Sequence, residues 1–201
     1  MSRRARWPIA ALAVLACAVP GVALGQDGER KQDNFALAVT ETDGGRAFDF
    51  SWEVIRQKRG PVDSFNAARA VAVCTDCRAA AIAFQVVLAW GDGSEQNSAH
   101  NRAEALNAFC TNCHVYAGAK QVTATMSGPT RFTGEGRATL ADVRNKIRAL
   151  EFTDLNAGQL EAAVDAQWAR VIEAVVEQTE RIDGEGSLMV EDLDEREADD
   201  A

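Results

Sequence analysis

The stretch NFALAVTETDGGRAFDFSWEVI, residues 34–55, decides the predicted fold. Its polar centre, Thr42-Asp43-Gly44-Gly45, has the composition of a tight turn between two strands. Period-two alternation of apolar residues on both sides of the turn predicts a β-hairpin whose strands bury one face. The alternating apolar residues are Phe35, Leu37 and Val39 before the turn, and Phe48, Phe50, Trp52 and Val54 after it.

Two further copies of this unit follow in the sequence. Residues 66–87 match residues 34–55 without a gap at an offset of 32, and residues 101–123 match after one inserted residue. Asn34 aligns with Asn66 and Asn101. Self-similarity at this period indicates one supersecondary unit that is used three times. The alanine-rich runs of the second and third copies also suit a helix, so a helical alternative stays open for them.

We therefore expect an α+β fold in which three repeated β-hairpins form an antiparallel sheet, within a β-repeat domain at residues 26–128. Lys120 occupies the apolar face of the third copy and predicts that its strand lies at the edge of the sheet. The same face of the second copy carries Ala80, Ile82, Phe84 and Val86.

Beyond Gly128 the apolar spacing becomes that of helices, which we place at residues 129–182. Thr139 with Asp142 resembles a capping pair for the first helix. A second amphipathic helix is predicted from about residue 157 to 182. We expect a helical hairpin packed on the sheet or on itself, and a partner-binding helix is the alternative.

The N-terminus predicts export. Residues 1–25 combine three arginines, an apolar run and a small-residue cleavage site, as in a signal peptide cut before Gln26. Processing as a lipoprotein anchored at Cys17 is the alternative, because Val14-Leu15-Ala16-Cys17 resembles a lipobox. Either route predicts an extracytoplasmic protein, secreted or associated with the cell envelope.

Charge limits the classes of partner. The chain has 21 basic and 30 acidic residues, a net charge of −9, which disfavours nucleic-acid binding. Residues 183–201 hold nine acids and one arginine with few large apolar side chains, so a disordered acidic tail is predicted there. The most apolar later segment, residues 79–90, is too short to span a membrane.

Four cysteines of the predicted mature chain form two CxxC pairs, Cys74/Cys77 and Cys110/Cys113, at the turn position of their repeats. In an exported protein we expect disulfides that staple the turns, with local pairing favoured. The same spacing suits a zinc site with four cysteine ligands, which is the alternative metal site. Thiol–disulfide exchange is a further alternative, but both pairs are predicted to join strands rather than to open a helix.

The sequence CTNCH, residues 110–114, has the signature of covalent haem attachment, with His114 as the axial ligand and Met126 or His100 as distal candidates. Position 114 aligns with Arg78 and Arg46 in the other copies, so we expect no haem and an incidental histidine. HExxH, GxSxG and a phosphate-binding glycine loop are absent from the sequence, so no catalytic residues are predicted and we expect a non-enzymatic protein.

The sequences CTDCRAAAIAFQVVLAW, residues 74–90, and GPTRFTGEGR, residues 128–137, resemble a group of actinobacterial exported proteins of unknown function with a repeated CxxC module. The likeness covers about residues 33–180 and extends to the C-terminal region of proteins labelled peptide zinc metalloproteases. It implies an extracytoplasmic module beside a membrane peptidase-like region. No peptidase metal ligand carries over, because this chain contains neither that motif nor its membrane helices.

Together these features predict an exported, non-catalytic β-repeat module with a binding or structural role at the cell envelope. Its partner would be an unidentified protein or envelope component, and no cofactor is expected. The alternative function is an accessory domain related to membrane peptidase systems, with four cysteines that bind zinc or exchange disulfides.

Overall fold

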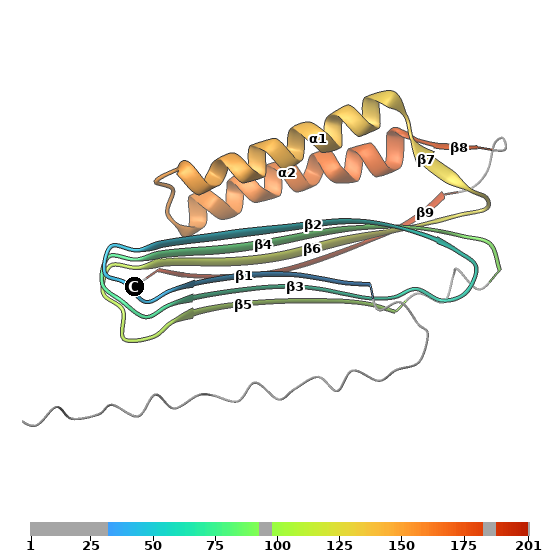
Figure 1. Ribbon diagram of the computed structural model, residues 1–201. Coiled ribbons are helices and arrows are strands. Elements are labelled where there is room, and N and C mark those ends of the chain that lie inside the picture. The colour runs from blue at the N-terminus through green and yellow to red at the C-terminus, as the bar shows by residue number, and fades with distance from the viewer. Residues whose placement is uncertain (1–31, 93–97, 183–187, 201) are drawn as a thin grey trace, which may run out of the picture. The chain divides into compact units, whose positions relative to one another are not determined.

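The computed structural model describes residues 32–92, 98–182 and 188–200, so the predicted signal peptide at residues 1–25 lies outside the described residues. The described chain is an α+β structure of strands and two helices. Its repeats alternate between two sheets (Figure 1). Sheet A contains β1 (Gln32–Thr40), β3 (Asp63–Ala72) and β5 (Ser98–Asn107), and sheet B contains β2 (Arg46–Lys58), β4 (Arg78–Trp90), β6 (His114–Met126) and β9 (Leu188–Asp200).

Each repeat is one coil of a β-solenoid. It contributes one strand to sheet A and the next to sheet B, and the strands of successive coils pair in parallel. Residues that align between the repeats are lateral neighbours in these ladders. Asn34 pairs with Asn66 and Asn66 with Asn101, while Arg78 pairs with His114. The repeat period is therefore the length of one coil.

The prediction of antiparallel hairpins is wrong. The two strands of a repeat do not pair through their backbones; they lie in different sheets and face each other through their side chains. Period-two alternation is the same in a hairpin and in such an arch, because it reports the buried face of a strand and not its hydrogen-bonding partner. The helical alternative for the second and third copies is also excluded, since both form strands.

The space between the sheets is lined mainly by alanine, which allows the two sheets to pack closely. A ladder of asparagine amides, two buried and one partly buried, runs through it. Asn34 Nδ2 donates to Asn66 Oδ1 at 2.8 Å, and Asn66 Nδ2 donates to Asn101 Oδ1 at 3.0 Å. Asn66 Nδ2 also reaches the Lys120 carbonyl oxygen of sheet B at 3.0 Å. These bonds satisfy polar groups that would otherwise be costly to bury, and they fix the register of the coils.

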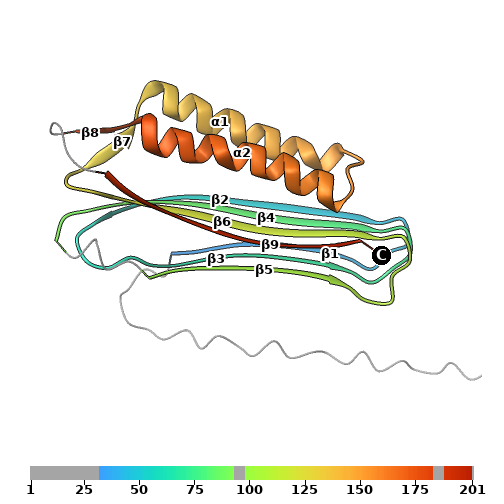
Figure 2. The ribbon, with the colours of Figure 1, turned by 180° about the vertical axis from the view of Figure 1, so that it is seen from behind.

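The helices cover the opposite face of sheet B, as Figures 1 and 2 both show. They are α1 (Gly134–Ala149) and α2 (Ala157–Glu177), with a short 3-10 helix at Leu150–Phe152 between them. Trp168 of α2 packs edge-on against Phe84 of β4, with ring centres 4.9 Å apart. This contact lies in a large apolar core, so the predicted helical hairpin packs on the sheet.

Both helices have boundaries that differ from the predicted ones. Thr133 caps α1 by accepting from the Gly136 N–H, so the helix begins before the predicted Thr139–Asp142 pair. Asn156 caps α2 with a capping box to Gln159. α2 ends at Glu177 because the next residues form β8 (Thr179–Arg181), which pairs with β7 (Thr130–Phe132).

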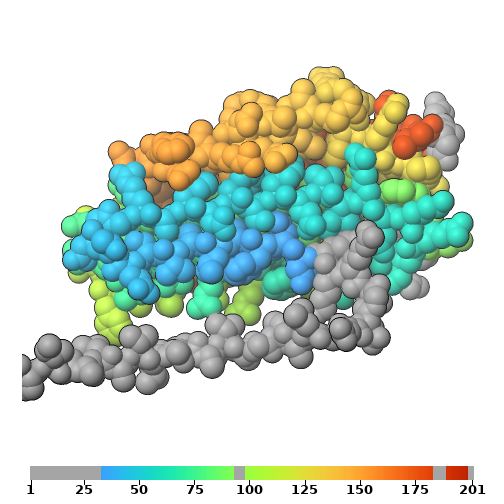
Figure 3. All heavy atoms as spheres, viewed as in Figure 1, coloured from blue at the N-terminus to red at the C-terminus, as the bar shows by residue number. Residues whose placement is uncertain are grey.

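The first coil carries polar residues where later coils carry small or neutral ones. Asp49 and Ser51 of β2 stand in register with Ala81 and Ala83, on the inner face of sheet B. Asp49 Oδ2 accepts a hydrogen bond from the Leu37 N–H at 2.7 Å. Inward-pointing polar groups of this kind protect sheet edges from pairing with other chains, so the first coil acts as a cap. This coil (blue to cyan) lies at the front in Figure 3.

The other end of the solenoid is covered by part of the acidic tail. Leu188–Asp200 forms β9, antiparallel to β6 (Figure 2). Glu197 Oε2 accepts from the Ala105 N–H of β5 at 2.9 Å, so β9 bridges both sheets. Residues 183–187 and 201 of the segment predicted to be disordered lie outside the described residues. Charge alone predicts disorder for residues 188–200, whereas here the segment pairs with the edge of β6 and Asp194 forms an ion pair with Lys120.

Candidate functional site

Both CxxC pairs lie in arcs that carry the chain from sheet A to sheet B. The third residues of these motifs, Asp76 and Asn112, have positive φ angles of 56° and 57°, and Gly44 holds the equivalent position in the first coil with φ 69°. Asp and Asn tolerate this left-handed conformation better than most residues. The Asn112 Nδ2 donates to Asp76 Oδ1 at 2.6 Å, so the arcs stack as closely as the strands do.

The structure pairs Cys74 with Cys77 and Cys110 with Cys113 as disulfides. Each pair has a Cα–Cα distance of 6.0 Å, within the usual range for a disulfide. Cys77 and Cys113 are fully buried in the alanine-lined interior, whereas Cys110 is partly exposed. The bridges thus close both arcs locally.

Steric crowding explains why the first coil has no such bridge. Arg46, Arg78 and His114 are aligned in the sheet B ladders, so Gly45 occupies the position that Cys77 and Cys113 hold in the later coils. A Cβ atom at position 45 would lie 2.5 Å from the Thr42 carbonyl oxygen, closer than real Cβ contacts allow. The tight Thr42–Gly45 turn therefore excludes a cysteine side chain at this point.

The structure separates the residues of the haem signature. Cys113 faces the interior between the sheets, but His114 lines a cavity on the helix-covered face of sheet B. Met126 lies at the far end of the same strand, and His100 lies on β5, where its ring contacts the Ser98 hydroxyl. His114 and Met126 thus share the helix-covered face but lie at opposite ends of β6, and His100 belongs to the other sheet, so the geometry offers no common position for a haem iron.

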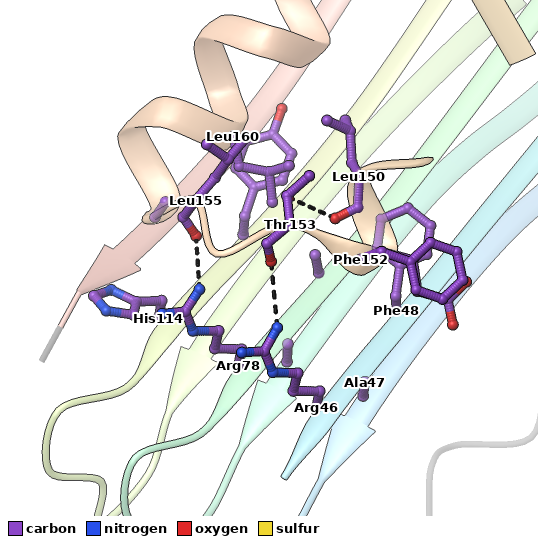
Figure 4. Close-up of a pocket in the computed structure, with 15 residues that line it drawn as sticks. Arg46, Ala47, Phe48, Arg78, His114, Leu150, Phe152, Thr153, Leu155 and Leu160 are labelled. Carbon is purple, nitrogen blue, oxygen red and sulfur yellow. Dashed lines mark hydrogen bonds between the residues drawn. The ribbon is translucent and has the colours of Figure 1, made fainter. Parts of the chain in front are cut away.

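A cavity of about 280 Å³ lies between the start of the sheet B strands and the connection from α1 to α2 (Figure 4). Arg46, Arg78 and His114 line it from equivalent positions of three successive coils. The opposite wall is apolar and includes Leu150, Leu155 and Leu160. The cavity therefore has a basic side and an apolar side.

The arginines of this cavity already bind the helix connection. Arg46 forms an ion pair with Asp154, whose other neighbour is Arg78 at 3.6 Å. Arg46 donates to the Thr153 carbonyl and Arg78 to the Leu155 carbonyl, each at 3.4 Å (Figure 4). The hydrogen bond from Arg46 and its charge lower the pKa of Asp154. We conclude that Arg46 and Arg78 anchor the connection between the helices.

Sheet A carries an exposed apolar surface, here called the β1 face, formed by Phe35, Leu37 and Val39. Their exposed fractions are 51%, 47% and 46%. The equivalent positions of β5 hold Arg102, Glu104 and Leu106, so apolar character is concentrated on the first coil.

Apolar alternation in the sequence predicts that the residues of the β1 face are buried, and this prediction is wrong. In the structure Ala36 and Ala38 face the interior instead. The charged residues at matching positions of the third copy are the signal that could have identified the exposed face.

No protein-family model, curated protein or solved structure matches the chain. In the described part of the chain, neither helix combines the length and apolarity needed to span a membrane.

Proposed function

We propose that the protein is an exported, non-catalytic binding module of the cell envelope, and that the β1 face is the surface that binds a protein partner. The observation that carries this proposal is the row of half-exposed Phe35, Leu37 and Val39 on one strand. Contiguous exposed apolar surface is unfavourable in water and is typical of interaction sites. The rigid ladder to β3 presents these side chains at fixed spacing.

The disulfides support a structural role for the cysteines in this proposal. Alanine buries little apolar area, so a core lined by alanine contributes less stability than one of larger side chains. A short covalent bridge in each of two arcs limits the conformations of the unfolded chain and compensates in part. Export through the predicted signal peptide would supply the oxidising surroundings that such bridges need. The resemblance to peptidase-associated proteins makes a component of a membrane peptidase system one candidate partner.

Site-specific photo-crosslinking tests the proposed surface. A photoreactive amino acid at position 37 of the full chain is expected to form a covalent adduct with one partner protein in the producing cells. The matched control carries the same amino acid at position 102, on the outer face of β5. An absent adduct at position 37, or identical adducts at both positions, rejects the β1 face as the binding surface.

A thiol count tests the other half of the proposal. Protein recovered from outside the cells should contain no free thiol among the four cysteines of the arcs and no bound metal. Four free thiols together with one zinc ion would contradict a disulfide-stapled module.

A further inference from the structure

Sulfur atoms from two different coils converge inside the arcs. The Sγ atoms of Cys77, Cys110 and Cys113 all lie within 4.8 Å of one another. Two of these residues are fully buried and the third is partly exposed. Cys74 completes the set, because its sulfur is bonded to that of Cys77. Stacking of the coils, and not the CxxC spacing alone, produces this group.

We propose that reduction of the two disulfides converts the four cysteines into a closed zinc site. This inference concerns the arcs and does not depend on the β1 face. Thiolates bind Zn²⁺ at about 2.3 Å in a tetrahedron, so neighbouring sulfurs lie about 3.8 Å apart. Three of the four sulfurs already lie within 4.8 Å of one another, and that of Cys74 is bonded to one of them, so side-chain rotations can gather all four after the disulfides open. The bound ion would then link the second and third coils, which the local disulfides do not.

The backbone around the sulfurs offers both acceptors and a donor. The Cys74 carbonyl oxygen lies 2.7 Å from Cys110 Sγ and 3.0 Å from Cys113 Sγ, so these two sulfurs must rotate away from it to bind the ion as thiolates. The Cys77 N–H points at Cys113 Sγ, with a distance of 3.4 Å from nitrogen to sulfur. Such a donor stabilises negative charge on the sulfur. Three of the four cysteines are buried among alanines and all four would be ligands, which is typical of structural zinc sites rather than catalytic ones with an open position.

Cys110 is the entry point for the reductant, because the other three cysteines of the arcs are buried. The thiolate of an external dithiol attacks Cys110 Sγ, and Cys113 leaves with the electron pair of the broken bond. The second thiol of the reductant closes its own disulfide and frees Cys110. Two electrons and two protons have then passed from the dithiol to the Cys110/Cys113 pair.

The buried Cys74–Cys77 disulfide is reduced through Cys110. Its thiolate lies within 4.8 Å of Cys77 Sγ, and attack there forms a Cys77–Cys110 bond and releases Cys74. A second dithiol attacks Cys110 Sγ again and releases Cys77. Two dithiols are oxidised and four thiols result. Binding of one Zn²⁺ to the four thiolates then releases their protons.

Cobalt titration tests the site, since Co²⁺ in a tetrahedral thiolate site absorbs strongly in the visible range. The full chain carrying Cys17→Ser is reduced with a dithiol, freed of it without oxygen, and titrated with Co²⁺. We expect the absorption to saturate at one ion per chain, and Zn²⁺ to abolish it. The unreduced chain should give none.

The matched control is the Cys74→Ser/Cys77→Ser variant, which keeps one CxxC pair and should lose the absorption. A second readout does not depend on the folding of this variant: Zn²⁺ should protect all four thiols of the reduced wild-type chain from alkylation. The proposal is overturned if the reduced wild-type chain gives no absorption, gives no more than the control, saturates at half an ion per chain, or alkylates at the same rate with Zn²⁺.

Discussion

Lys120 of β6 and Asp194 of β9 are direct neighbours in the antiparallel ladder, and their side-chain nitrogen and oxygen atoms lie 2.7 Å apart. Lys120 Nζ also lies 2.7 Å from Asp165 of α2. In the earlier coils Trp52 and Phe84 hold the position of Lys120 beneath the helices. The third coil thus has a lysine where the earlier coils have an aromatic ring, and this lysine binds carboxylates of both β9 and α2.

We expect Lys120→Met to destabilise the protein by about 2 to 3 kcal/mol, because Asp165 and Asp194 would keep their charges without this partner. The expected loss is smaller than the roughly 3 to 5 kcal/mol for a fully buried pair, since both carboxylates are partly exposed. Urea unfolding measures the change. Lys58→Met, at an exposed lysine of β2, should cost less than about 0.5 kcal/mol. Equal values for the two variants would refute the role given to Lys120.

Asp142 of α1 joins the two helices and should make the stability of the protein sensitive to acid. It accepts from Lys146 and from Arg170 of α2, at 3.0 and 2.7 Å, and these bonds lower its pKa. A carboxyl group with a lowered folded-state pKa stabilises the fold above its unfolded-state pKa, near 3.9, and loses this effect as the pH falls through its folded-state value.

Asp142→Asn should therefore lower the melting temperature at pH 7 by about 2 °C, with the difference shrinking below about pH 3. Calorimetry at the two pH values measures it. Glu173→Gln, at an exposed carboxylate of α2, serves as the comparison and should change the melting temperature little at either pH. A difference for Asp142→Asn that stays constant with pH would contradict the assignment.

Removal of either disulfide should weaken the fold without abolishing it. For a bridge across a CxxC loop the chain-entropy model gives about 2 kcal/mol. Cys74→Ala/Cys77→Ala and Cys110→Ala/Cys113→Ala should each lose about this amount in urea unfolding, with the far-ultraviolet circular dichroism spectrum retained. Complete loss of the β spectrum in either variant would show that the bridges are needed to form the solenoid at all.

Two adjacent glycines of the first arc should respond in opposite ways to substitution. Gly44→Asn should be tolerated within about 0.5 kcal/mol, because nothing lies within 4 Å of a Cβ there and Asn112 adopts the same positive φ in the third coil. Gly45→Ala should cost more than about 1 kcal/mol, since its Cβ would meet the Thr42 carbonyl. Thermal unfolding of the two variants measures both losses of stability. A larger loss for Gly44→Asn than for Gly45→Ala would contradict the packing described for this turn.

The repeats illustrate how far sequence patterns lead for this protein. The alignment of Asn34, Asn66 and Asn101 anticipated which residues lie side by side, because parallel coils of equal length stack equivalent positions. Alternation around Thr42–Gly45 could not distinguish a hairpin from an arch, since both bury one face of each strand. For β1 the alternation even suggested the wrong face: Phe35 and Leu37 are exposed, and the small Ala36 and Ala38 fit the narrow interior.

For the candidate site, too, the sequence predicted some features and the tertiary structure decided the others. The alignment of the repeats predicted both CxxC pairs at turns, but their spacing left disulfides and a zinc site as alternatives; the structure pairs the cysteines locally. Only the stacked coils bring Cys110 within 4.8 Å of Cys77, which is 33 positions earlier in the chain. Likewise, no local pattern relates Asp154 to Arg46, because their contact depends on where the helical hairpin lies on sheet B.

The sequence by itself determined the length of the repeat, the positions of its turns and cysteines, and the change from strands to helices after Gly128, because these depend on local side-chain chemistry and periodicity. The tertiary structure decided which strands pair, which face of β1 meets water, and that the acidic segment Leu188–Asp200 becomes a strand. These outcomes depend on hydrogen-bonding partners and countercharges that lie tens of residues away, such as Lys120 for Asp194.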